Sequence, residues 1–205
     1  MEIRDFNLLI VGVGGQGVIS AIQILTKAAL LNNYKVRTAE THGMAQRGGS
    51  VATFLRFGDK IEGPLIARGT CQVILALEAS EAVRYFNYAG SETFFFINNK
   101  IIIPPTVHSM DIEYPNIEMI QKFLQQVSTH VFFVNGHEEA LKVGNLRTLN
   151  IFMLGALLGS EKLPITQEAI EKSMMLLIPK KYQKINEIAL KKGIEKGKII
   201  ISEIE

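Results

Sequence analysis

The sequence opens with a short apolar segment, a run of glycines and an amphipathic segment, an order that few folds accommodate. Residues 6–13 read FNLLIVGV, which is typical of a strand buried on both faces. Residues 14–17 read GGQG, and apolar residues then recur at helical spacing from 18 to 31. A second strand predicted at 35–40 completes a strand–helix–strand unit with a right-handed crossover. The N-terminal part of the chain therefore predicts a sheet of α/β type.

Strand and helix patterns continue to alternate along the rest of the chain. Further strands are predicted at 50–57, 72–78, 93–97, 100–103 and 130–134. Helices are predicted at 81–88, 117–126, 138–143, 149–158, 166–177 and 181–196. Paired turn signals between 48 and 64 favour an antiparallel insertion around residues 50–70. We therefore expect an α/β, Rossmann-like, doubly wound and mostly parallel sheet over 1–148, with a helical C-terminal extension, 149–205, packed on it in one structural unit.

Composition limits the chemistry that the chain can carry. Of its 205 residues 47% are hydrophobic, so it can bury a core, but it has a single cysteine, Cys71. One thiolate cannot form a disulfide within the chain, nor can it hold an iron–sulfur cluster, which needs a set of cysteines. The four histidines, His42, His108, His130 and His137, lack the spacing of metal ligands. We expect this chain to hold no metal of its own.

Charge and hydropathy indicate where the protein works. The formal net charge is only +2, so we expect no nucleic-acid partner. No apolar run reaches the ~18 residues of a membrane span. The N-terminus lacks the pattern of a signal peptide. These observations predict a cytoplasmic protein with no membrane partner.

Residues 12–17 match the spacing G-x-G-x-x-G between a predicted strand and a predicted helix. In such a turn the first glycine permits a tight bend, the second lets a phosphate approach the backbone, and the third lets helix and strand pack closely. The helix N-terminus adds unpaired N–H groups. The functional interpretation is a phosphate-bearing ligand, and the alternative is that the glycines serve only the turn. The candidate binding residues are Gly12, Gly14, Gly15, Gln16 and Gly17.

A second set of candidate residues follows the second predicted strand, so we expect it near the same edge of the sheet. Glu40 ends that strand, where an acid can bind a ribose hydroxyl. Arg47 is a charged fork suited to carboxylate or phosphate, and Gly48 and Gly49 let the backbone expose N–H groups. His42 has no partner of a catalytic type beside it, so we predict no catalytic residue in this chain.

Several other residues have a structural interpretation. Asp59, Glu62 and Glu78 are predicted to be solvated charges, and Cys71 a small buried apolar residue. Residues 180–198 hold seven lysines and two glutamates, and we interpret most of the lysines as the solvated side of a helix, with an acidic partner surface as the alternative. The predicted apolar face of that helix is formed by Tyr182, Ile185, Ile188 and Ala189.

Taken together, five segments resemble the gamma-type domain of 2-oxoacid:ferredoxin oxidoreductases. They are residues 12–17 (GVGGQG), 41–49 (THGMAQRGG), 63–66 (GPLI), 77–84 (LEASEAVR) and 150–157 (NIFMLGAL). The resemblance runs from residue 7 to about 193 and is nearest to the branch of the indolepyruvate:ferredoxin oxidoreductase beta subunit. The pairing of the glycine turn with the loop His-Gly-x-x-x-Arg-Gly-Gly is its most specific part.

The resemblance implies an accessory subunit of a thiamine-diphosphate- and iron–sulfur-dependent enzyme. The implied reaction converts an aryl 2-oxoacid, coenzyme A and oxidised ferredoxin to an aryl-acetyl-CoA, carbon dioxide and reduced ferredoxin. This chain has no cluster cysteines and no Gly-Asp-Gly…Asn-Asn signature for thiamine diphosphate, because Asn98-Asn99 stands without the first half. The resemblance therefore implies a larger partner that holds thiamine diphosphate and the clusters and passes electrons to ferredoxin.

Three questions stay open on the sequence alone. The glycine turn and the Arg47 loop either contact the phosphates of coenzyme A or serve subunit docking. Within the family, a pyruvate- or 2-oxoglutarate-type gamma subunit is the alternative to the indolepyruvate type. Outside it, the alternatives are a stand-alone NAD(P)-binding oxidoreductase, favoured by the glycine motif and Glu40, and a nucleotide-sensing module without a catalytic partner.

Overall fold

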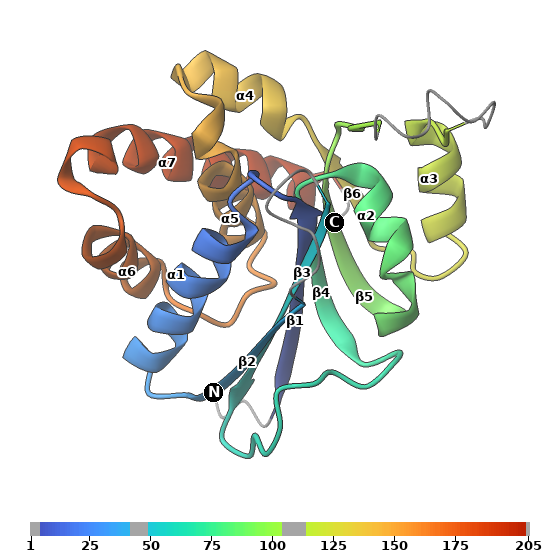
Figure 1. Ribbon diagram of the computed structural model, residues 1–205, viewed down its shortest axis with the longest axis horizontal. Coiled ribbons are helices and arrows are strands. Elements are labelled where there is room, and N and C mark those ends of the chain that lie inside the picture. The colour runs from blue at the N-terminus through green and yellow to red at the C-terminus, as the bar shows by residue number, and fades with distance from the viewer. Residues whose placement is uncertain (1–4, 42–48, 104–113, 204–205) are drawn as a thin grey trace.

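The computed structural model describes residues 5–41, 49–103 and 114–203, which build one six-stranded sheet between two layers of helices (Figure 1). The strand order is β2-β3-β1-β4-β5-β6. The strands are β1 Phe6–Val13, β2 Lys35–Thr41, β3 Ser50–Gly58, β4 Cys71–Ala76, β5 Ala89–Asn98 and β6 Val131–Val134.

Five of these strands run in one direction, and β3 alone runs against them. β4 pairs with β1 in parallel, as β5 does with β4 and β6 with β5, whereas β3 is antiparallel to both β1 and β2. The predicted α/β, mostly parallel sheet is therefore confirmed. The antiparallel insertion expected around residues 50–70 is β3, which separates β2 from β1.

The helices divide between the two faces of the sheet. Their bounds are α1 Val18–Leu31, α2 Ala79–Arg84, α3 Ile117–Leu124, α4 Gly136–Val143, α5 Leu149–Gly159, α6 Gln167–Leu177 and α7 Lys180–Ser202, with short 3-10 turns at Phe86–Tyr88 (η2) and Leu146–Thr148 (η4). In Figure 1, α1, α5, α6 and α7 lie on one side and α2 and α3 on the other.

Successive residues of β1 supply both layers of the core. Leu8 and Ile10 pack with α1, α5, α6 and α7, while Leu9 and Val11 pack with α2 and α3. All four side chains are fully buried, as the apolar run at residues 6–13 predicts for a strand covered on both faces. Burial on both faces fixes β1 at the centre of the molecule, with the turn that follows it at an edge of the sheet.

The segment α5 belongs to this core. Ten of its eleven residues are buried, and seven of these belong to the same apolar cluster as β1 and α1. The proposed division of the chain at residue 148 stays a prediction, but a single apolar cluster crosses that position.

The contact between α5 and α7 is made through glycines. Gly155 and Gly159 on α5 face Gly193 and Gly197 on α7, and a Cβ added at any of them would collide with a backbone carbonyl oxygen of the other helix. Small residues one turn apart on both helices therefore let the two backbones approach closely. This contact explains why α7 presents its glycine side to the core.

The apolar face predicted for the last helix was wrong in part. Ala189 is buried as predicted, but Tyr182 and Ile188 are 39% and 42% exposed. The rest of the buried side of α7 contains Leu190, Ile194 and its glycines. α7 packs close to α5, and only a face lined with glycine permits that approach. Large apolar side chains such as Tyr182 and Ile188 are therefore on the other side.

The strand predicted at 100–103 was also wrong. The main chain there folds over the start of α2, since Ala79 donates its N–H to the carbonyl of Lys100 at 3.0 Å and Ile102 donates to the Glu78 carboxylate at 3.0 Å. Ile102 and Ile103 are 40% and 43% exposed, so this apolar run does not enter the sheet.

Two further findings describe what the fold offers. Within the described part of the chain, no helix is both long and apolar enough to cross a bilayer. Within the same residues, no group of three or more His, Cys, Asp or Glu side chains is arranged to hold a metal ion.

Candidate functional site

The candidate site lies where the chain changes sides of the sheet. After β1 the chain enters α1 on one face, and after β4 it enters α2 on the other face. The carboxyl ends of these two neighbouring parallel strands form the switch point at which ligands bind in open α/β sheets. The glycine turn, residues 12–17, occupies this position.

The backbone of the turn requires glycine at two places. Gly15 and Gly17 have φ values of +95° and +85°, a region that other residues seldom adopt. A Cβ on Gly17 would also lie 2.6 Å from the amide nitrogen of Asn150, which itself donates to the Gly17 carbonyl at 3.1 Å. The turn therefore packs against α5 as well as against the sheet.

The side chain of Gln16 closes the inner side of the turn. Its Oε1 accepts the N–H of Val13 at 2.7 Å, and its Nε2 donates to the carbonyl of Leu77, just past β4, at 2.9 Å. Leu77 also accepts the amide of Asn98 at 2.9 Å. A side chain of the protein thus occupies the space between β1 and β4 and uses one of the N–H groups of the turn.

The outer side of the turn keeps donors available. The N–H groups of Gly15 and Gly17 have no acceptor among the described residues, and Gly15 is exposed with no atom within 4 Å of an added Cβ. The first turn of the 14-residue helix α1 follows directly and contributes positive potential. This outer side can accept one phosphate or carboxylate group.

The second predicted loop ends beside the glycine turn. Gly14 donates its N–H to the carbonyl of Gly49 at 2.9 Å, and Ser50 at the start of β3 lies opposite Val13. The two motifs that the sequence singled out therefore meet at one edge of the sheet. His42, Arg47 and Gly48, which were predicted in the same loop, lie outside the described residues.

Glu40 lies farther from the turn than a simple strand–helix–strand unit predicts. Glu40 pairs with Thr53 on β3, and Thr53 pairs with Ile10 on β1. Since neighbouring strands lie about 5 Å apart, two strand spacings place the backbone of Glu40 about 10 Å from β1. The role proposed for Glu40 at a ribose would have to bridge that separation.

Two glutamates that the sequence analysis did not select lie at the same edge. Glu78, predicted as a solvated charge, is only 1% exposed, so that prediction was wrong. Its carboxylate accepts the N–H groups of Glu81 and Ile102 at 2.9 and 3.0 Å. Burial raises the pKa of Glu78 above its ordinary value, and these two hydrogen bonds oppose that shift. Asp59 and Glu62 are exposed, as predicted.

Glu81 connects α2 to the strand that follows the second loop. Its carboxylate accepts the hydroxyl of Ser50, and it also receives a hydrogen bond from the Arg84 guanidinium at 3.2 Å. The Tyr85 hydroxyl lies 3.3 Å from that of Ser50. The spacing Glu-x-x-Glu after a strand was the available signal, because an acid at a helix N-cap commonly accepts the backbone N–H three residues on.

The residues present do not fit an iron–sulfur cluster or the Asn-Asn half of a thiamine site. Cys71 is buried, and burial raises the pKa of its thiol from 9.0 to about 12, so it stays protonated. Both ends of the Asn98 amide are used within the fold, one on Leu77 and one on the N–H of His137. The small, buried apolar Cys71 that the sequence predicts is confirmed.

The fold and its turn define a Rossmann-like α/β domain in which Gln16 fills the space between β1 and β4 at the switch point. Comparison with known proteins then identifies the particular family. The chain belongs to the family described as pyruvate ferredoxin/flavodoxin oxidoreductase, which it matches over residues 7–196.

Named relatives cover nearly the whole chain. It is 39% identical over 187 residues to the indolepyruvate oxidoreductase subunit IorB of Archaeoglobus fulgidus. The aligned region covers 91% of this chain and 92% of the relative. It is 36% identical over 201 residues to the subunit of the same name from Pyrococcus horikoshii, covering 97% and 99%. Among solved structures, the gamma subunit of a keto/oxoacid ferredoxin oxidoreductase from Geobacter sulfurreducens has the same fold, with a TM-score of 0.68, 21% identity and coverage of 95% and 99%.

Proposed function

We propose that this chain is the accessory subunit of an indolepyruvate-type 2-oxoacid:ferredoxin oxidoreductase. The observation that carries the proposal is the match, over more than nine-tenths of both chains, to relatives named as subunits of indolepyruvate oxidoreductase. The reaction is the coenzyme A-dependent oxidation of an aryl 2-oxoacid with reduction of ferredoxin, in the cytoplasm. The chain is not catalytic alone, and a larger partner supplies thiamine diphosphate and the iron–sulfur clusters.

The proposal assigns the outer side of the glycine turn to a phosphate group of coenzyme A at the contact with the larger subunit. It is supported by the N–H groups of Gly15 and Gly17, which have no acceptor among the described residues, by the start of α1 and by the adjacent end of the Arg47 loop at Gly49. Subunit docking alone is the second candidate, supported by the exposure of Gly15 and by the N–H of Gly14 being used within the chain.

A native purification tests the subunit assignment. The tagged chain is purified anaerobically from its own host, and co-eluting proteins, iron and thiamine are identified. We expect a brown partner and activity on indolepyruvate that exceeds activity on pyruvate, phenylpyruvate and 2-oxoglutarate. A colourless protein recovered alone at low salt would contradict the proposal.

A matched pair of variants separates phosphate contact from docking. Gly15→Asn and Gly15→Asp have nearly the same shape, and Asn and Asp are the residues that best tolerate the left-handed backbone at this position. They differ by one negative charge. If the turn contacts a phosphate, the aspartate variant raises the KM for coenzyme A about tenfold over the asparagine variant and leaves the KM for the 2-oxoacid unchanged. Equal KM values for coenzyme A would favour docking alone.

The stand-alone NAD(P) alternative makes a different prediction. It needs the crevice that Gln16 fills and an acid close to the turn, whereas β3 separates Glu40 from β1. We expect no saturable binding of NADH to the purified chain by calorimetry. Saturable binding that Glu40→Gln abolishes would favour the alternative.

A further inference from the structure

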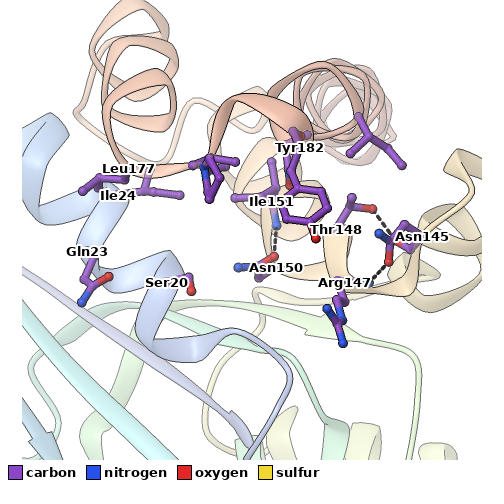
Figure 2. Close-up of a pocket in the computed structure, with 14 residues that line it drawn as sticks. Ser20, Gln23, Ile24, Asn145, Arg147, Thr148, Asn150, Ile151, Leu177 and Tyr182 are labelled. Carbon is purple, nitrogen blue, oxygen red and sulfur yellow. Dashed lines mark hydrogen bonds between the residues drawn. The ribbon is translucent and has the colours of Figure 1, made fainter.

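A cavity lies on the face of the sheet that carries α1, and Asn150 in its wall contacts Gly17 of the glycine turn. It measures about 210 Å³ and is enclosed by α1, by η4 with the start of α5, and by the junction of α6 and α7 (Figure 2). None of the predicted site residues lines it. Its volume is below the ~300–1,000 Å³ of typical ligand pockets, so it suits a small molecule.

The two sides of this cavity differ in character. Ile24, Ile151 and Leu177 form an apolar side, with the ring of Tyr182 beside them, and in Figure 2 they lie above Ser20 and Arg147. Ser20, Asn150 and Arg147 lie along the opposite side. A molecule that fills the cavity therefore meets apolar carbon on one side and hydrogen-bond donors on the other.

The charge of the lining is of one sign. Of the fourteen residues that line the cavity, none is acidic, and Arg147 is the only one with a full charge. Among the described residues no carboxylate forms an ion pair with Arg147. By contrast, Asn150 is held by its bonds to Gly17 and to the N–H of Ile151, which makes that part of the wall rigid.

We propose that this cavity binds a small organic anion with an apolar, flat body. The Arg147 guanidinium holds the anionic group as a charge-assisted hydrogen-bond donor, and the body lies between Ile24, Ile151 and the Tyr182 ring.

The test uses the full chain labelled at isoleucine methyl groups and observed by NMR. Phenylacetate and its neutral isostere phenylacetamide are titrated in parallel, and phenyl phosphate is added as a third probe. We expect saturable shifts at Ile24, Ile151 and Ile185, which line the cavity, and none at Ile74, which is buried among the residues packed with α2 and α3. Phenylacetate should bind at least tenfold more tightly than phenylacetamide.

Two variants assign the anion contact. Arg147→Gln should weaken phenylacetate binding about tenfold to a hundredfold. Arg68→Gln removes another exposed charge, in the loop before β4 and outside the cavity, and should leave phenylacetate binding unchanged. Stronger binding of phenyl phosphate than of phenylacetate would assign the site to phosphate monoesters, within the same proposal. Equal binding of acid and amide, shifts that Arg147→Gln leaves intact, or no shift with any probe would overturn it.

Discussion

Among single residues, Gln16 shows how a glycine turn can be stabilised without a ligand. Its side chain bonds to Val13 within the turn and to Leu77 past the neighbouring strand, so it joins the ends of β1 and β4. In a turn built for a dinucleotide, that space is left for the ligand.

We expect Gln16→Ala to lower the free energy of unfolding by about 1–3 kcal/mol, because both partners lose a hydrogen bond in a half-buried place. Chemical denaturation measures this value. Gln126→Ala is the matched control, since Gln126 is exposed and has no side-chain hydrogen bond among the described residues. Equal stability of the two variants would contradict the role given to Gln16.

The thiol of Cys71 gives a second prediction for a single residue. Because burial raises its pKa to about 12, only about one thiol in ten thousand is ionised at pH 8 in the folded protein. A thiol reagent at that pH should therefore leave the native protein unmodified and modify the denatured protein rapidly. Rapid modification of the native protein would show that the thiol is accessible.

The same group gives the stability a pH dependence of known sign. The unfolded thiol ionises near 9.0, whereas the folded thiol keeps its proton to about 12. The stabilisation is complete below pH 9.0 and is lost as the pH rises from 9.0 to about 12, by up to about 1.4 kcal/mol per pH unit. Between pH 9.0 and 10 the free energy of unfolding should therefore fall more steeply with pH for the native sequence than for Cys71→Ala.

Among the secondary-structure elements, the crossing of α5 and α7 gives the clearest prediction. An alanine usually stabilises a helix by about 1 kcal/mol relative to glycine. Here we expect Gly159→Ala and Gly197→Ala to destabilise the protein by about 1–3 kcal/mol or more, since the added methyl group meets a backbone carbonyl. Gly63→Ala is the control, because nothing lies within 4 Å of its added Cβ. Thermal unfolding of the three variants measures the difference, and a stabilising Gly197→Ala would refute the close contact.

Elements bounded by local signals were predictable from the sequence, and those decided by distant contacts were not. The bounds predicted for the first strand and helix, 6–13 and 18–31, are those of β1 and α1, because glycines mark both ends of the turn between them. The strand at 100–103 was wrong because its backbone bonds to Glu78, some twenty residues earlier. No local pattern reports such a bond.

The same distinction applies to the candidate site. The glycine turn follows from spacing, but its contact with Gly49 depends on β3 pairing with β1, more than thirty residues away. The closure by Gln16 depends on Leu77, and the burial of Glu78 depends on the segment that folds over it. In each case the residue type was visible in the sequence and its partner was not.

For the whole molecule, one apolar cluster joins the first strand to the last helix. Leu8 of β1 and Ile200 of α7 belong to the same set of buried side chains, with α1 and α5 between them. The C-terminal helices therefore complete the core of the sheet domain.

We expect a chain that ends at residue 148 to fail to fold, because the apolar surface of β1 and α1 loses the helices that cover it. Circular dichroism during heating should show no cooperative transition for this fragment. A chain that ends at Ser202 lacks the last three residues, of which Glu203 is exposed, and should unfold like the full protein. A cooperative transition of the 1–148 fragment would instead support an autonomous domain with a dispensable extension.

The glycine contact between α5 and α7 also has a consequence for synthesis. Proteins emerge N-terminus first, so β1, α1 and α5 are complete on the ribosome before Gly193 and Gly197 have been added. Until then the side of α5 that contacts α7 has no cover from its own chain, and the nascent protein is open to capture by other apolar surfaces. Completion of α7 therefore ends the period in which this surface is prone to aggregate.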